Sequence, residues 1–251
     1  MSDRIDNIAT TYHGNMLPDM HIEEACQLYE LDWILSFFPT KQTRVLDLGF
    51  GDGVNYEAIA QNCNVTMIEG SKTLCERAIK ISEEKNLGVQ VVHSMFEDFE
   101  SSEKYDVILA SHVLEHVDDP VGLLAGMQKF LTASGKIVGI VPNAESFHRR
   151  LGVAMGLQRA LDDLGARDLM VGHQRVYSLT SLNKDVQIAG MTIESHRGFF
   201  LKVLANSQMI HLEVGVLEGL LRLSDGLPTE DCANIGFVLV PVAGTRNRFS
   251  S

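Results

Sequence analysis

The 251-residue sequence has no apolar run long enough to cross a lipid bilayer. A membrane-spanning helix needs about 20 consecutive apolar residues, whereas the longest candidate, Asn234–Ala243, has only the length of a strand. The N-terminal residues Met1–Asp6 also lack the apolar region of a secretory signal. We therefore expect a cytoplasmic protein that does not bind membranes.

Positive charge is scarce as well. The sequence contains 21 Lys and Arg residues against 33 Asp and Glu, which gives a net charge of −12. Non-specific binding to nucleic acids depends on cationic side chains that neutralise phosphates, and the longest basic run here is Arg149–Arg150. We expect no nucleic-acid partner.

Cysteine is rare, and its spacing is uninformative for metal binding. Cys26, Cys63, Cys75 and Cys232 form no C-x-x-C pair and do not have the spacing of zinc ligands. In a reducing compartment such residues are usually buried thiols. We expect four free, buried cysteines and no metal site.

Short β-branched runs alternate with longer helical patterns along the chain, whose 45% hydrophobic and 22% charged residues are typical of a globular domain. This alternation predicts an α/β fold with a doubly wound, mostly parallel sheet and helices on both faces. We expect six or seven strands and favour seven. The expected strands are Arg44–Leu48, Val65–Glu69, Val89–His93, Tyr105–Ala110, Gly135–Val141, a part of Met191–Val203, and Ile235–Val242. The expected helices are Ile22–Phe38, Val54–Gln61, Lys72–Lys85, Pro120–Leu131, Leu179–Ala189 and Ser207–Leu223, with irregular helical structure over Glu145–Met170.

The most informative stretch is Val45–Gly53, where a strand runs into glycines at alternate positions before a helix begins. Gly49, Gly51 and Gly53 permit backbone angles and close approaches that a Cβ atom would block. Such a loop suits a nucleotide-like ligand at the carboxyl end of the first strand. Glu69, about 20 residues beyond the first glycine, closes the second strand where an acid can bind ribose hydroxyls.

Asp47 indicates which kind of nucleotide-like ligand the glycine loop binds. Its carboxylate, at the strand end before the glycines, would repel a pyrophosphate but attract an ammonium or sulfonium group. The dinucleotide fingerprint is also incomplete, because Val54 stands in the place of its last glycine, and the lysine of a P-loop is missing. S-adenosylmethionine has a ribose, a cationic amino-acid tail and no phosphate, and it fits this pattern.

Four segments together resemble one family: Asp47–Gly53, Met67–Ser71, Ser94–Asp98 and Tyr105–Val117. Over roughly Arg44–Val141 and the last two strands, the chain resembles the class I (Rossmann-like) S-adenosylmethionine-dependent methyltransferases of the small-molecule branch. The resemblance implies S-adenosylmethionine as the cofactor and contacts to it from Asp47, Gly49, Phe50, Gly51, Gly53, Glu69, Gly70, Ser71, Met95, Phe96, Glu97, Ser111 and His112. Phe50 departs from the small or polar residue that is usual there. A doubly wound protein that binds another nucleotide, or none, is the alternative.

Methyl transfer is an in-line displacement from an activated sulfonium, so an enzyme gains mainly by positioning the acceptor and excluding water. A base is needed only where the accepting atom carries a proton, and histidine is the natural one. The candidate catalytic residues are His116, His148 and His173. For His116, a structural or cofactor-side role is the alternative.

The acceptor is expected to contact segments outside the resemblance, because variable chemistry on such folds sits in loops and caps. Arg149, Arg175 and Tyr177 are the candidates in a helical insert, residues 143–178, and could pair with a carboxylate or phosphate. A solvated helix face and a structural turn are the alternatives. Residues 1–40 are expected to form a helical lid, with Tyr12 over the cofactor and His13 near the acceptor, or else a merely capping terminus.

The leading hypothesis is a single methyltransferase domain, residues 1–251, that methylates an oxygen or nitrogen of a small metabolite, which can be anionic. One alternative is a tRNA or protein methyltransferase, against which the charge argues. The other is a non-catalytic scaffold that keeps the fold. The apolar segment Met209–Leu223 could serve a homodimer as readily as it could serve substrate binding.

Overall fold

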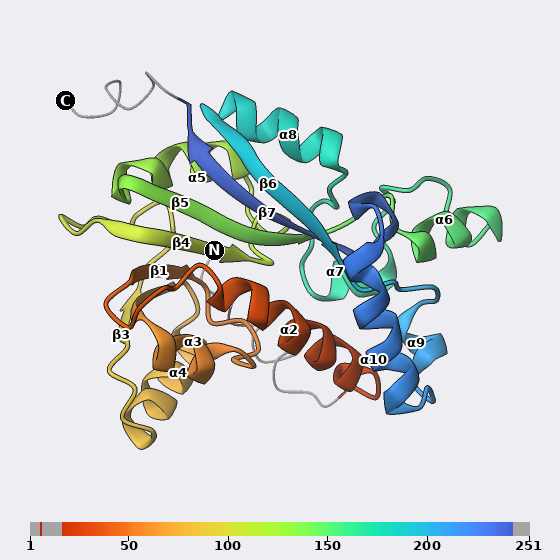
Figure 1. Ribbon diagram of the computed structural model, residues 1–251, viewed down its shortest axis with the longest axis horizontal. Coiled ribbons are helices and arrows are strands. Elements are labelled where there is room, and N and C mark those ends of the chain that lie inside the picture. The colour runs from red at the N-terminus through yellow and green to blue at the C-terminus, as the bar shows by residue number, and fades with distance from the viewer. Residues whose placement is uncertain (1–5, 7–16, 243–251) are drawn as a thin grey trace.

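The computed structural model describes residue 6 and residues 17–242, and its centre is a seven-stranded sheet (Figure 1). The strands are β1 (Arg44–Leu48), β2 (Asn64–Glu69), β3 (Gln90–His93), β4 (Tyr105–Ser111), β5 (Leu131–Pro142), β6 (Met191–Phe199) and β7 (Asn234–Pro241). Their order is β3-β2-β1-β4-β5-β7-β6, and every neighbouring pair is parallel except the two that involve β7. The prediction of a mostly parallel, doubly wound sheet is confirmed.

Helices cover both faces of the sheet (Figure 1). One face packs against α2 (Met20–Leu35), α3 (Tyr56–Asn62) and α4 (Lys72–Glu84), and the other against α5 (Pro120–Met127) and α8 (Leu179–Ile188). The alternation within β1 explains this, since Val45 belongs to the first apolar layer and Leu46 to the second. Burial on both faces is typical of parallel strands.

Four further helices lie beyond the carboxyl ends of β1 and β4 (Figure 1). The segment between β5 and α8, residues 143–178, carries α6 (Phe147–Ala154) and α7 (Ala166–Met170). After β6 come α9 (Asn206–Met209) and α10 (Val214–Leu223), and they pack against the start of α2 through Ile22, Met209 and Leu217. None of the helices in the described part of the chain is long and apolar enough to cross a membrane.

The structure corrects two predicted elements. The single helix expected over Ser207–Leu223 is wrong, because the chain leaves the helical conformation between α9 and α10, and Glu213 is extended. This break lets Met209 and Leu217 both reach the same apolar cluster. The fifth strand begins at Leu131 and not at Gly135, and an irregular register between β4 and β5 takes up the added residues. The four cysteines are free and buried, as expected.

Candidate functional site

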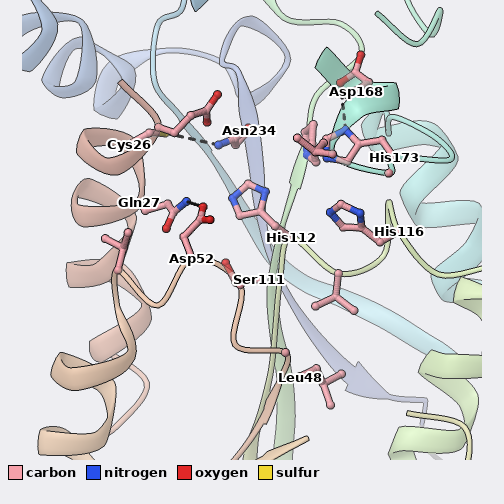
Figure 2. Close-up of a pocket in the computed structure, with 18 of the residues that line it drawn as sticks. Cys26, Gln27, Leu48, Asp52, Ser111, His112, His116, Asp168, His173 and Asn234 are labelled. Atoms are coloured by element: carbon pink, nitrogen blue, oxygen red, sulfur yellow. Dashed lines mark hydrogen bonds and ion pairs between the residues drawn. The ribbon is translucent and has the colours of Figure 1, made fainter. Parts of the chain in front are cut away.

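A cavity of about 970 Å³ opens at the carboxyl ends of β1, β2 and β4. Its walls come from α2, from the glycine loop after β1, from the segment after β4, and from the insert of residues 143–178. Figure 2 shows Gln27 and Asp52 on one side of this cavity, His116 and His173 on the other, and His112 between them. The parallel strands point their carboxyl ends the same way, so residues far apart in the sequence meet here.

The glycine loop has the backbone conformation that its composition predicts. Gly49, Gly51 and Gly53 all have positive φ angles, of 91°, 55° and 75°, where glycine alone among the common residues is unstrained. At Gly53 a Cβ atom would also lie 2.5 Å from Cζ of Phe50. The Phe50 ring is buried and makes an edge-to-face contact with Tyr56, so the ring occupies the space beside Gly53.

Two backbone N–H groups orient the carboxylate of Glu69 at the end of β2. Its Oε2 accepts a hydrogen bond from the backbone N–H of Phe50 at 2.9 Å, and its Oε1 accepts one from Ser71 N–H at 2.7 Å. A carboxylate has about four acceptor positions. Two therefore remain for the hydroxyl groups of a ribose.

Asp47 lies beside Glu69 and is buried. Burial, together with the negative charge of Glu69, raises the pKa of Asp47 to about 7. Desolvation and a like charge both disfavour the ionised carboxylate. The attraction of a positively charged ligand would offset both effects, so these two carboxylates form a site suited to a cation.

Most of the predicted cofactor contacts line this cavity: Asp47, Gly49, Phe50, Gly51, Gly53, Glu69, Gly70, Met95, Phe96, Glu97, Ser111 and His112. Ser71 lies outside the described cavity wall. Its Oγ accepts from Leu74 N–H at the start of α4 and donates to Asp6 at 2.6 Å, so its contacts are structural. Tyr12 and His13 lie outside the described residues.

His112 is enclosed by two buried carboxylates, Glu30 from α2 and Glu115. Its Nδ1 lies 3.3 Å from Glu115 Oε1, and its Nε2 lies 3.4 Å from Glu30 Oε2. Burial alone lowers the pKa of His112, but the hydrogen bonds and charges of the two glutamates raise it well above its usual value. His112 is therefore an imidazolium that links α2 to the end of β4.

Glu30 was not among the residues predicted for this site. A signal for it exists, because the buried residues of α2 are Ile22, Cys26, Glu30 and Ile34, spaced four apart on one helix face. A glutamate in an otherwise apolar stripe needs a polar partner inside the protein. Glu30 accepts hydrogen bonds from Asn234 Nδ2 at 2.7 Å and from the Cys26 thiol.

His116 and His173 meet on the opposite side of the cavity, with ring centroids 4.7 Å apart (Figure 2). His173 Nδ1 lies 3.0 Å from Oδ1 of Asp168 in α7. The other oxygen of Asp168 accepts a hydrogen bond of 2.7 Å from Arg149. Burial lowers the pKa of His116 to about 4 against the opposing effect of Glu115, so His116 is neutral.

The Arg149 side chain lines the cavity, but its guanidinium is hydrogen-bonded to groups of the insert. Its guanidinium also donates to the carbonyl oxygens of Leu161 and Asp163, at 3.3 and 2.9 Å. It therefore fixes the fold of the insert around Asp168 and has little capacity left for an acceptor.

Arg175 and Tyr177, both predicted to contact the acceptor, do not line the described cavity. The Arg175 guanidinium donates to the carbonyl oxygens of Leu114 and Val117, at 2.8 and 2.5 Å, and so ties the end of the insert to the segment after β4. Tyr177 is 2% exposed, and its hydroxyl donates to Asp185 at 3.3 Å. Both side chains have the structural role that was the alternative.

His148 and Lys202 both line the cavity, and Lys202 supplies its positive charge there. Burial, followed by the charges of Lys202 and Arg149, lowers the pKa of His148, so His148 is neutral. Its Nδ1 lies 3.1 Å from the hydroxyl of Ser146. Lys202, in the loop after β6, makes no ion pair within the described residues and was not predicted.

Comparisons with known proteins agree with this geometry. A family model described as "Methyltransferase domain" matches residues 20–196. The ubiquinone biosynthesis O-methyltransferase of Actinobacillus pleuropneumoniae serotype 7 is 34% identical over 99 residues, which cover 37% of this chain and 42% of that protein. The match thus spans less than half the length of this curated relative.

Many solved structures are similar in fold, among them the following two. One is an O-methyltransferase from neocarzinostatin biosynthesis in complex with S-adenosyl-L-homocysteine and 1,4-dihydroxy-2-naphthoic acid, with a TM-score of 0.54 and 15% identity over 88% of this chain and 57% of that chain. The other is the plantazolicin methyltransferase in complex with S-adenosylhomocysteine, with a TM-score of 0.55 and 17% identity over 94% of this chain and 89% of that chain. At these identities the likeness concerns the fold.

Proposed function

The chain belongs to the methyltransferase family, and on that premise we propose that it transfers a methyl group from S-adenosylmethionine to an oxygen or nitrogen of a small acceptor. The observation that carries the proposal is the pair of buried carboxylates, Asp47 and Glu69, at one end of a cavity whose other end is lined by histidines. The first end suits a cationic nucleoside, and the second leaves room for an acceptor.

The residues at the cofactor end match the chemical groups of S-adenosylmethionine. Asp47 is placed to pair with its cationic amino-acid tail, and Glu69 has free acceptor positions for the ribose hydroxyls. Met95, Phe96 and Glu97, which follow β3, are the proposed contacts to the adenine ring. When bound, this cofactor supplies a methyl group that is already activated by the sulfonium.

The chain's own contribution is then to position the acceptor and exclude water. His116, His148 and His173 line the acceptor end and are the proposed catalytic residues. The insert, residues 143–178, forms much of this end, and residues 1–40 are proposed to act as a lid. The names of the relatives favour oxygen as the accepting atom.

We propose further that the acceptor carries a negative charge. Lys202 and the neighbouring His148 line the acceptor end, and Lys202 has no carboxylate partner in an ion pair among the described residues. A cation without a partner in a cavity wall suits a carboxylate or phosphate, because such a charge-assisted hydrogen bond is stronger than a neutral one.

The test is a transfer assay with S-adenosylmethionine labelled in the methyl group. The purified protein is incubated with a fractionated metabolite extract, and separately with tRNA and with protein from the same cells. We expect label in anionic small molecules. Label only in tRNA or protein, or label in none of the three, would contradict the proposal.

A further inference from the structure

Three potential metal ligands come together at the acceptor end of the cavity. Glu115 and His116 follow β4, and His173 lies at the end of the insert. One ligand atom from each of these residues lies within 4.8 Å of the other two. The insert is held in this position by Gln174 and Arg175, which donate hydrogen bonds to backbone carbonyl groups of the segment after β4.

Two of the three side chains have another polar atom engaged by a neighbour. Glu115 Oε1 lies 3.3 Å from His112 Nδ1, and His173 Nδ1 lies 3.0 Å from Asp168 Oδ1. This leaves Glu115 Oε2 and His173 Nε2 for a ligand. Outer partners of this kind orient the histidines and carboxylates of metal sites.

Glu115 supplies an independent observation. Its side chain is fully buried, and its Oε2 has no hydrogen-bond partner among the described residues. A buried carboxylate oxygen without a donor is costly, and such atoms are rare in folded proteins. A bound cation would satisfy it.

We propose that Glu115, His116 and His173 bind a divalent transition-metal ion of the zinc type. Two imidazoles and one carboxylate are a common ligand set for such an ion, whereas Mg²⁺ prefers oxygen ligands alone. Zinc–ligand bonds of about 2.1 Å place tetrahedral ligand atoms about 3.4 Å apart. Binding therefore requires the ligand atoms, which lie within 4.8 Å of one another, to draw together by up to about 1.4 Å.

The inference rests on the proposed function in one respect, the use of the ion. His116 and His173 line the cavity, whereas Glu115 lies behind them. The open coordination positions therefore face the acceptor end. An oxygen of the acceptor bound there would lose its proton to water more readily, because a divalent cation stabilises the anion.

The test is a titration of tag-free, metal-stripped protein with Co²⁺, followed by the visible absorption of the ion and then by displacement with Zn²⁺. We expect one saturable Co²⁺ site per chain, which Zn²⁺ empties. His173→Ala and Glu115→Gln should each abolish saturation. Asp168→Asn, which removes only an outer partner, should weaken binding about 10- to 100-fold.

The matched control is His148→Ala, because His148 lines the same cavity and belongs to the same insert but is not one of the three ligands. It should bind Co²⁺ as the parent protein does. Binding of S-adenosylhomocysteine, measured on the same samples, shows that each variant is folded. Absence of a saturable site in a parent protein that binds S-adenosylhomocysteine would refute the metal site and leave the methyltransferase proposal standing. So would a site that His173→Ala and Glu115→Gln leave unchanged.

Discussion

At the scale of single residues, Asp47 is the group whose ionisation should change most when the cofactor binds. In the unliganded protein, burial and Glu69 raise its pKa to about 7. The folded state then holds a proton that the unfolded state loses above about pH 4. The contribution of Asp47 to stability must therefore fall as pH rises from about 4 to 7.

Asp47→Asn removes that titration. The unliganded variant should be more stable than the parent protein near pH 8, by on the order of 4 kcal/mol at most, and the difference should shrink towards about pH 4. Its affinity for S-adenosylmethionine should fall at the same time. Denaturant unfolding at several pH values measures the first effect, and calorimetric titration measures the second. A variant less stable than the parent near pH 8 would show that burial and Glu69 do not raise the pKa of Asp47.

Lys202 is the residue that should recognise the charge of the acceptor. Lys202→Met keeps the apolar stem and removes the ammonium, so the KM for an anionic acceptor should rise about 10- to 100-fold, as expected for a lost charge-assisted hydrogen bond. The dissociation constant of S-adenosylhomocysteine should stay the same. Lys136→Met is the control, because Lys136 pairs with Glu194 on the sheet. Equal KM values in the two variants would contradict an anion site at Lys202.

At the scale of elements, the insert of residues 143–178 depends on one buried arginine. The Arg149 side chain is 7% exposed, and its guanidinium holds α7 and the loop before it through Asp168, Leu161 and Asp163. Without it, Asp168 is left as a buried charge with one partner fewer. Breaking a buried pair in this way typically costs about 3–5 kcal/mol.

Arg149→Met should therefore open the insert locally. Hydrogen exchange should rise over residues 161–173, and kcat should fall, while the affinity for S-adenosylhomocysteine should change less than about twofold, because the glycine loop is untouched. Arg159→Ala is the control. Arg159 is 95% exposed in its pair with Asp163, and such a pair contributes at most about 1 kcal/mol. Faster exchange over β1 and α3 as well would mean that Arg149 supports the whole domain and not the insert alone.

The sequence predicted the strands that form the cofactor end because local signals mark them. Val45–Leu48 is a short apolar run closed by glycine, and Glu69 follows a run of the same kind, so both carboxylates could be placed at strand ends. No local signal marked the break between α9 and α10, which depends on packing against α2. The contact of His116 with His173 could not be predicted from the sequence either, because it depends on how the insert folds back over β4.

The predicted roles of Arg175 and Tyr177 show the same limit. A His-Gln-Arg segment near a strand end has the composition of an anion site, but the Arg175 guanidinium is used by carbonyl groups of its own fold. The sequence shows which side chains can donate hydrogen bonds to a ligand. Whether those side chains are free to do so depends on the backbone carbonyl groups that the tertiary structure brings near them. Lys202 is the converse case, since an isolated lysine carries no pattern.

At the scale of the whole molecule, apolar side chains remain exposed on α10. Val216 and Leu223, seven residues apart and therefore on one side of the helix, are 47% and 59% exposed, and exposed apolar side chains that lie together often mark an interface. We predict a homodimer through this face. Light scattering should give twice the mass of the 27.7 kDa chain and should return to one chain for Val216→Lys. A parent protein that is monomeric at all concentrations would contradict the interface.

Two further properties of the whole molecule, its net charge and the position of its cavity, bear on which ligands it can bind. A net charge of −12 disfavours a nucleic-acid acceptor, and the topology brings the ends of β1, β2 and β4 to one edge. Asp47 and Glu69 therefore face a single large cavity that suits a cationic nucleoside beside a small acceptor.

The most direct measurement is calorimetric titration of the parent protein and Asp47→Asn with S-adenosylmethionine, S-adenosylhomocysteine, NAD and ATP. We predict one site per chain for the first two ligands, weaker binding of both to the variant, and no saturable binding of the two phosphate-containing ligands. Tight binding of NAD or ATP, with no site for S-adenosylmethionine, would show that the two carboxylates do not receive a cationic methyl donor.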